Sequence, residues 1–280
     1  MKPLIFSLLI VLLLLPRLGL AQGLVEELNA FRQRPLEFAS LTGKRLEELK
    51  KIWPESLWRG ILNGVKEVQE DEVLTEVAAQ RAEKILSVGL PLPENFSKEL
   101  SQILEERAFP ALMAHESYAV LAFENPLSEE EAQGILLTAL IAGALQKRDG
   151  DALLLFPCWN RVGAAFRFGE IAIEGENYHA AVIVFILAAI EDETPFLLGQ
   201  IYGVMEEKVM PLEEATIKLE NLWNKKVLLT TNTWPDGSYC LEGYPAGNYL
   251  LEGFAEGWKP KKELNYLPNK PHRKDFYLFR

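Results

Sequence analysis

The chain has 280 residues, of which 49% are hydrophobic and 25% are charged. This composition is ordinary for a folded globular protein, and the length favours two domains over one. The formal net charge of −11 argues against nucleic acid and against an anionic membrane surface as partners, because both repel an acidic chain.

The N-terminal segment has the pattern of a signal peptide. Lys2 precedes the apolar run Leu4–Leu15, and Gly19 and Ala21 are small residues at the spacing that a signal peptidase recognises. The alternative is an uncleaved membrane anchor, but a run this short spans about 30 Å of hydrocarbon poorly. We therefore expect a signal peptide over residues 1–21 and a secreted or periplasmic protein that does not span the membrane.

Residues 22–190 are expected to form one α+β domain, because helical patterns come first and strands follow. Ser128 and Glu131 form a capping box before an apolar helix. In the helix expected over 72–88, Arg81 is among the charged residues predicted mostly to face water. The expected helices are Leu24–Gln33, Glu72–Val88, Lys98–Arg107 and Glu129–Leu145, and the expected strands are Tyr118–Phe123, Val162–Phe168, Glu170–Ile173 and Ala180–Ala188.

The pattern changes after residues 191–195, an acidic stretch that we interpret as a hinge. Alternation then places Tyr239 and Leu241 on one face of a strand and Ser238 and Cys240 on the other. Short strands separated by Gly and Pro turns predict a β-sandwich over residues 196–280. The strands expected here are Leu198–Val204, Thr216–Leu219, Val227–Thr231, Ser238–Leu241, Gly247–Gly253 and Asp275–Phe279.

The two cysteines, Cys158 and Cys240, are too few for a disulfide scaffold. In an oxidising compartment they are a possible disulfide, which would tie the two predicted domains together. Two unrelated thiols are the alternative, because connectivity cannot be deduced from a sequence.

Asn29, Arg32 and Pro35 are spaced N-x-x-R-x-x-P near the start of the chain, and residues 162–165 read VGAA within an expected strand. These motifs resemble the CAP superfamily of cysteine-rich secretory and pathogenesis-related (SCP-like) proteins. The resemblance covers about residues 24–190, and it implies an α/β/α sandwich.

Members of that family carry two histidines and two acidic residues around a central cleft, where some bind a divalent metal. By this resemblance the first histidine position falls in residues 89–92 and the second at Gly150 or Asp151, so both histidines are missing from the chain. The family's glutamate falls on Glu116 or, in a competing register, on Glu124.

His115 and His179 leave open a relocated histidine and glutamate cluster for a metal or a general base. Neighbouring residues of a strand point to opposite faces, which argues against convergence of His115 and Glu116. We therefore expect a degenerate cleft containing His115, Glu116, Glu124 and His179, with no catalytic residue, no metal and no cofactor.

Residues 199–204, 211–217, 231–241, 244–250 and 275–278 closely resemble the carboxypeptidase regulatory-like, transthyretin-like sandwich family. The resemblance implies a spacer, stability or recognition module. We expect Trp223, Trp234 and Trp258 to be buried or at an interface, while stacking on a sugar is the alternative for an exposed one.

The sequence thus predicts an exported, non-catalytic binding protein for an envelope protein, a glycan or an apolar ligand. One alternative is an envelope-directed hydrolase that uses the relocated Glu and His pair. Another is a lipid carrier, which requires an enclosed apolar cavity of at least about 300 Å³.

Overall fold

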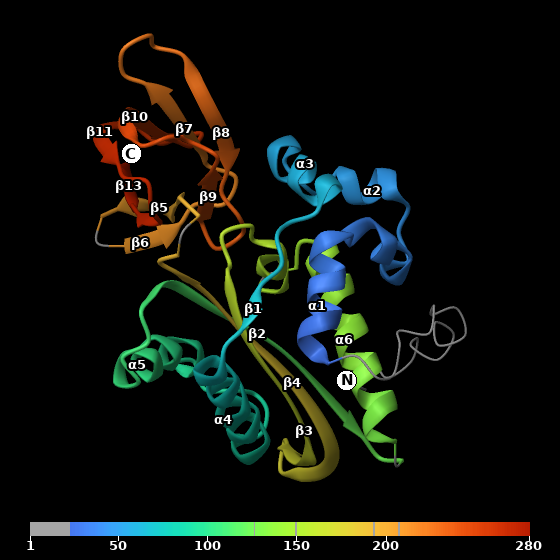
Figure 1. Ribbon diagram of the computed structural model, residues 1–280. Coiled ribbons are helices and arrows are strands. Elements are labelled where there is room, and N and C mark those ends of the chain that lie inside the picture. Colours follow the sequence, from blue (N-terminus) through green and yellow to red (C-terminus); the bar gives the residue numbers. More distant parts are fainter. Residues whose placement is uncertain (1–22, 126, 149, 193, 207) are drawn as a thin grey trace.

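The computed structural model describes residues 23–125, 127–148, 150–192, 194–206 and 208–280. The predicted signal peptide therefore lies outside the described residues. The fold is mixed α+β (Figure 1). We call residues 23–190 the N-terminal region and residues 196–280 the C-terminal region.

A four-stranded sheet forms the middle layer of the N-terminal region. Its order is β1-β3-β4-β2, with β1 parallel to β3 and the other neighbours antiparallel. The central β4 is apolar on both faces and buried from Ala180 to Ala189, whereas β2 lies at an edge. The strands are β1 (Gln69–Glu70), β2 (Ala111–Phe123), β3 (Arg161–Ile173) and β4 (Glu176–Ile190).

Helices cover both faces of this sheet, which gives a helix–sheet–helix arrangement (Figure 1). One face packs against α4 (Glu72–Val88), α5 (Glu99–Glu106) and the 3₁₀ turn η3 (Phe96–Lys98). The other face packs against α1 (Leu24–Gln33), η2 (Pro35–Thr42), α2 (Leu46–Lys50), α3 (Glu55–Asn63), α6 (Glu129–Leu145) and η4 (Asp151–Leu155). Gly163 lets α4 approach the sheet, because a Cβ there would overlap the backbone of Leu74.

The Asn and Arg side chains of the N-x-x-R motif in α1 form hydrogen bonds with the backbone segments that lie against this helix. The Asn29 side chain donates to the carbonyl of Val68 (2.9 Å) and accepts from its N–H (2.8 Å). The fully buried Arg32 donates to the carbonyls of Lys66, Leu154 and Phe156. Burial lowers the pKa of Arg32 to about 9, and the charge of Glu242 opposes this shift. The motif therefore joins distant backbone segments.

The C-terminal region is a β-sandwich of two sheets that face one another across a single core. In one sheet the order is β11-β10-β7-β8; in the other, β5 lies at the centre and pairs with β6, β9, β12 and β13. Tyr239 and Leu241 point into this core, as the alternation predicted. The strands are β5 (Phe196–Met205), β6 (Lys208–Pro211), β7 (Thr216–Asn221), β8 (Val227–Asn232), β9 (Ser238–Glu242), β10 (Gly247–Phe254), β11 (Lys261–Leu267), β12 (His272–Arg273) and β13 (Phe276–Phe279).

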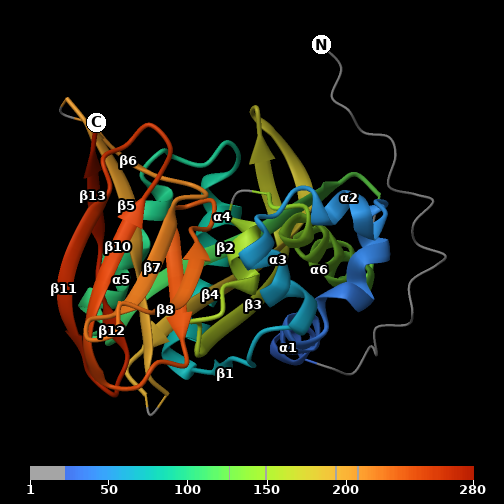
Figure 2. The same cartoon turned by 90° about the horizontal axis from the view of Figure 1, so that it is seen from above.

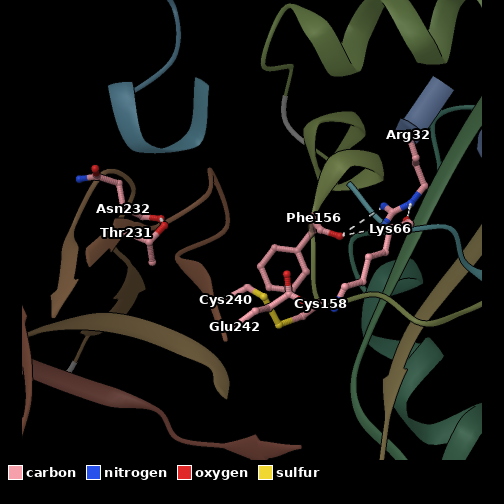
Figure 3. Close-up of a disulfide and its surroundings, with 8 residues drawn as sticks. All are labelled: Arg32, Lys66, Phe156, Cys158, Thr231, Asn232, Cys240 and Glu242. Atoms are coloured by element: carbon pink, nitrogen blue, oxygen red, sulfur yellow. Dashed lines mark hydrogen bonds and ion pairs between the residues drawn. A yellow bond between two sulfur atoms is a disulfide. The ribbon is translucent and has the colours of Figure 1, made fainter. Parts of the chain in front are cut away.

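The two regions lie side by side in both views (Figure 2) and share a core. The apolar cluster beneath α1 and α6 includes Phe196 and Trp234 of the C-terminal region. Cys158 and Cys240 form a disulfide across the same contact, with an S–S distance of 2.08 Å and a Cα–Cα distance of 5.8 Å (Figure 3). The division into two domains at residues 191–195 stays a prediction. Besides this linker, the shared core and the disulfide join the two regions.

Candidate functional site

The four predicted cleft residues all lie on β2 or beside its end, but on different faces and at different depths. His115 and Glu116 are consecutive residues of β2 and point to opposite faces of the sheet, as expected. Each one is held by a partner from a different part of the N-terminal region.

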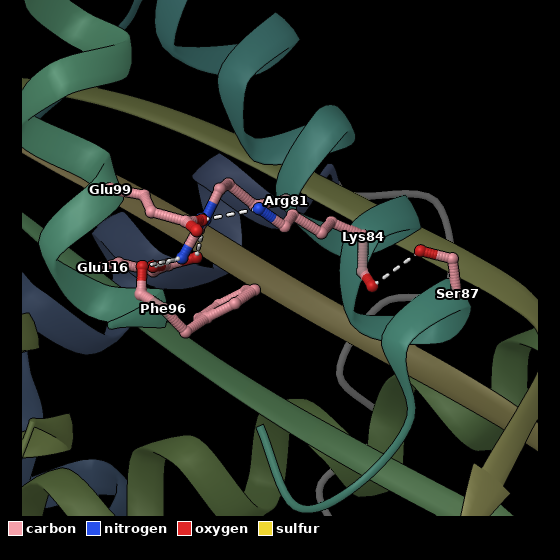
Figure 4. A network of polar contacts seen from close by, with 6 residues as sticks. All are labelled: Arg81, Lys84, Ser87, Phe96, Glu99 and Glu116. Atoms are coloured by element: carbon pink, nitrogen blue, oxygen red, sulfur yellow. Dashed lines mark hydrogen bonds and ion pairs between the residues drawn. The ribbon is translucent and has the colours of Figure 1, made fainter. Parts of the chain in front are cut away.

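Glu116 is engaged in a buried ion pair (Figure 4). Its carboxylate accepts two hydrogen bonds from Arg81 of α4, from Nε at 2.8 Å and from Nη2 at 2.7 Å. Arg81 also donates to Glu99 (3.0 Å) and to the carbonyl of Phe96 (2.8 Å), and its guanidinium stacks 3.5 Å from the centre of the Phe96 ring. The prediction that Arg81 faces water is wrong: it is 1% exposed. The Glu116 carboxylate thus holds helix α4 against strand β2.

His115 faces the opposite side, where the chain after α6 crosses the sheet. Its Nε2 lies 2.9 Å from the carbonyl oxygen of Gly150, so this nitrogen carries the proton and donates. Burial lowers the pKa of His115, and the charge of Asp236 opposes the shift. His115 is thus a buried histidine bonded to the backbone.

Glu124 and His179 lie at the far end of β2, and both are exposed. The strand register sets His179 opposite Phe123, on whose ring it stacks at 6.0 Å. Position 123 lies eight residue steps along β2 from His115, a distance of about 26 Å at about 3.3 Å per residue. The prediction of one cleft containing all four residues is therefore wrong, because His115 and Glu116 lie on opposite faces of the sheet and far from Glu124 and His179.

Asp151 occupies the position at which the family resemblance places a missing histidine. Its carboxylate accepts a hydrogen bond from Ser117 of β2 (3.3 Å) and pairs with Arg148 (2.9 Å). Burial raises the pKa of Asp151 to about 6, while Arg148 and then Ser117 oppose the shift. The sequence indicates Asp151 only as the residue that replaces a histidine, because its partner Ser117 lies 34 positions earlier on a separate strand.

A groove runs between β2 and α6, next to Asp151. Its volume is about 270 Å³, and apolar side chains of the helix form one wall while the strand forms the other. The lining residues are Tyr118, Ala119, Val120, Leu121, Ile135, Leu136, Ala139, Leu140, Arg148 and Asp151.

The strand wall of this groove is the free edge of a sheet. Among the described residues, β2 pairs with β4 on one side and with no strand on the other. Alternate residues of an edge strand present unpaired N–H and C=O groups outward. The thirteen residues of β2 include no Pro, Lys or Arg, the residues that commonly protect such an edge.

A second pocket of about 380 Å³ lies between α3 and the C-terminal region. Leu57, Ile61 and Trp234 supply apolar surface, and the Lys66–Glu242 ion pair (2.7 Å) stands in its wall. This pocket is open and mixed in character, whereas the lipid-carrier alternative requires an enclosed apolar cavity.

None of the helices in the described parts of the chain combines the length and apolar character that a membrane crossing requires. Across those same residues, no group of three or more His, Cys, Asp or Glu side chains is placed to hold a metal ion.

No protein-family model matches the chain, and no curated protein matches it. Among solved structures, the minor pilin of Streptococcus agalactiae shares 14% identity over 33% of this chain and 47% of the pilin, with a TM-score of 0.26. The group B streptococcus pilus 2b backbone protein shares 8% identity over 59% of this chain and 78% of its own, with a TM-score of 0.26. Chlorocatechol 1,2-dioxygenase from Pseudomonas putida shares 11% identity over 75% of this chain and 100% of its own, with a TM-score of 0.23.

This chain thus spans about half the length of the minor pilin. The three neighbours differ in function, and TM-scores this low carry no argument about what the present chain does. We therefore infer the function from the groove between β2 and α6.

Proposed function

We propose that the chain is an exported, non-catalytic binding protein that captures an extended segment of another polypeptide along β2. In this proposal the N-terminal region is a divergent CAP-like domain and the C-terminal region a carboxypeptidase regulatory-like sandwich. The observation that carries the function is the free edge of β2 beside the apolar groove of α6.

An edge strand selects its partner by backbone chemistry. Its unpaired N–H and C=O groups are satisfied by a strand laid alongside, and main-chain hydrogen bonds then supply affinity. A peptide added to β2 would direct alternate side chains toward α6, where Ile135, Ala139 and Leu140 offer apolar contact. The groove therefore favours a segment with apolar residues at every second position.

The position of the groove supports a peptide rather than a small molecule, because one of its walls is the free edge of a sheet. Its volume of about 270 Å³ lies just below the range of about 300–1,000 Å³ that is usual for small-ligand pockets. The groove instead provides space for individual side chains of a strand whose backbone remains at the edge.

The polar residues near β2 support binding without catalysis. Glu116 is committed to Arg81, and His115 donates to the backbone at Gly150. Asp151 has Ser117 and Arg148 as partners. Glu116, His115 and Asp151 are thus engaged in holding the strand and the groove in shape.

The C-terminal region acts in this proposal as a rigid support. The disulfide and the shared core prevent it from moving freely relative to β2. The side chain of Arg273 also donates to the carbonyl of Leu112 (2.8 Å), which occupies a backbone acceptor at the start of β2. A bound strand would therefore extend from that point toward Phe123.

The test begins with a display library of random peptides as long as β2, selected on the mature chain. Hydrogen exchange of the complex should show new protection of amides within residues 111–123, because a docked strand bonds to the free edge. The variant Ala139→Trp fills the groove, and it should weaken the selected peptides by at least about tenfold.

Glu130→Trp is the matched control, since it places the same side chain at an exposed position of α6 on a different helix face from the groove lining. It should bind peptides like the unmodified protein, and thermal unfolding of both variants checks that they are folded. Peptides that bind equally well to Ala139→Trp, or that protect another part of the chain, would overturn the proposal.

A further inference from the structure

The tip of the β7–β8 hairpin presents an exposed tryptophan. Trp223 is 83% exposed, whereas Trp53, Trp58, Trp159 and Trp234 are buried. Of the two environments expected for Trp223, burial is thus wrong, and an interface with a partner stays a prediction. The hairpin extends away from the rest of the molecule at the top of Figure 1. An isolated aromatic ring on a projecting turn has no packing role within the chain.

Hydrogen bonds within the turn hold this projecting conformation. Asn221 Oδ1 accepts the backbone N–H groups of Trp223 (3.0 Å) and Asn224 (3.2 Å). Asn224 Oδ1 accepts the N–H of Lys226 (3.0 Å), and Lys225 donates its N–H to the carbonyl of Asn221 (3.0 Å). The turn is therefore pre-organised, and little conformational entropy remains to be lost when the ring binds a partner.

The surface around the ring is apolar and basic. Val227 and Leu228 are 45% and 38% exposed, and Lys225 and Lys226 are exposed beside them. Residues 216–232 contain three lysines and one glutamate, so the hairpin is positive although the whole chain has a charge of −11. Charges beyond about 10 Å are largely screened at about 0.1 M salt, so the hairpin's own charge governs its contacts.

We propose that this tip inserts into the interfacial layer of an anionic lipid bilayer. Tryptophan is favoured at the level of lipid headgroups because its ring is amphipathic, and lysines there attract anionic lipid. The exposed Val227 and Leu228 extend the apolar surface that would enter the bilayer. The net charge of the whole chain predicted that an anionic membrane is not a partner. That prediction did not consider the local positive charge of this hairpin.

A glycan is a poorer match for the same tip. Sugars are recognised through hydroxyl hydrogen bonds as well as ring stacking, and the Oδ1 atoms of Asn221 and Asn224 already accept backbone N–H groups. The tip also projects, so no second wall encloses a sugar ring. The proposal is independent of the peptide groove, because the hairpin and β2 share no residue.

The test is binding of the mature chain to vesicles of equimolar phosphatidylglycerol and phosphatidylcholine, at about 0.1 M salt. Binding should shift the tryptophan emission to the blue and protect it from iodide, because Trp223 is the residue most open to quenching. Trp223→Ala should lower the partition coefficient by about tenfold or more, since a large apolar side chain no longer enters the interface. Replacing Lys225 and Lys226 with Gln should lower it by about fivefold per lysine.

Tyr266→Ala is the matched control, because it removes another exposed aromatic ring (64%) from the outer face of β11. It should leave vesicle binding unchanged. Equal binding of Trp223→Ala and the unmodified protein, or equal binding to neutral phosphatidylcholine vesicles, would overturn the proposal. So would a Trp223 emission change caused by oligosaccharides and not by anionic vesicles. None of these readouts involves a peptide, so the two proposals fail separately.

Discussion

The two regions satisfy their buried polar groups in different ways. The N-terminal region buries the guanidinium groups of Arg32 and Arg81, each surrounded by carbonyl or carboxylate oxygens. The C-terminal region buries neutral hydroxyls: Tyr239 donates to the carbonyl of Lys274 (2.5 Å) and Tyr249 to that of Pro245 (2.6 Å).

This difference determines what a single substitution costs in each region. An ion removed from water is stabilised only while its partners remain, so loss of one partner leaves an uncompensated charge. A neutral hydroxyl contributes about 1 kcal/mol and leaves one carbonyl unpaired when it is removed. The N-terminal region should therefore be the more sensitive of the two to changes at buried polar positions.

The largest expected effect follows from Arg81→Met. It leaves the Glu116 carboxylate, whose side chain is 4% exposed, without its bidentate partner. We expect the free energy of unfolding to fall by about 3–5 kcal/mol, measured by urea denaturation. The double variant Arg81→Met with Glu116→Met removes both charges and should recover most of the loss. A single variant that loses less than about 1 kcal/mol would contradict the comparison.

An intermediate effect is expected for Asp151→Asn, and it depends on pH. The folded-state pKa of about 6 lies above the usual value of 3.8, so the folded protein holds the proton more tightly than the unfolded chain. The stability of the unmodified protein should therefore fall as pH rises from about 4 to 6, and this fall should be absent in the variant.

Above pH 6 the Asp151→Asn variant should accordingly be more stable by about 3 kcal/mol, and near pH 4 the two proteins should be equal. Thermal and urea unfolding across this pH range provide the measurement. A difference in stability that does not vary with pH would show that burial of this carboxylate costs the fold little.

The smallest effects are expected in the C-terminal region, where two tyrosines form a matched pair. Tyr249→Phe removes the hydrogen bond to Pro245 and should cost about 1 kcal/mol. Among the described residues, the buried hydroxyl of Tyr244 has no hydrogen-bond partner, so Tyr244→Phe should be neutral or stabilising. Equal losses in the two variants, or a loss at Tyr244 alone, would contradict this view of the sandwich core.

Local signals in the sequence predicted several elements with the bounds that the structure has. Helices Leu24–Gln33, Glu72–Val88 and Glu129–Leu145 are confirmed, as is the capping box of Ser128 and Glu131. In each case the apolar spacing and the terminal residues lie within the segment itself. The alternation around Tyr239 and Cys240 was equally informative, because it depends only on neighbouring residues.

Features that depend on distant partners were not predictable in this way. Arg81 was assigned to water because it is charged, yet its partner Glu116 lies 35 positions later. The first half of β2 was missed because Glu116 and Ser117 interrupt its apolar pattern. The two segments expected around Gly169 proved to be the single strand β3. The groove is formed by an edge and a helix that only the sheet order brings together.

The shared core also has a consequence for the order in which the protein can complete its fold during synthesis. Trp53 and Phe156 of the N-terminal region pack on the ring of Trp234, at 5.3 and 5.9 Å. At about 5–20 residues per second, Trp234 is made roughly 2–9 s after Ile190 ends β4. For that interval Trp53 and Phe156 lack the ring that packs on them in the folded protein, so the core of the N-terminal region is completed only after β8 has been made.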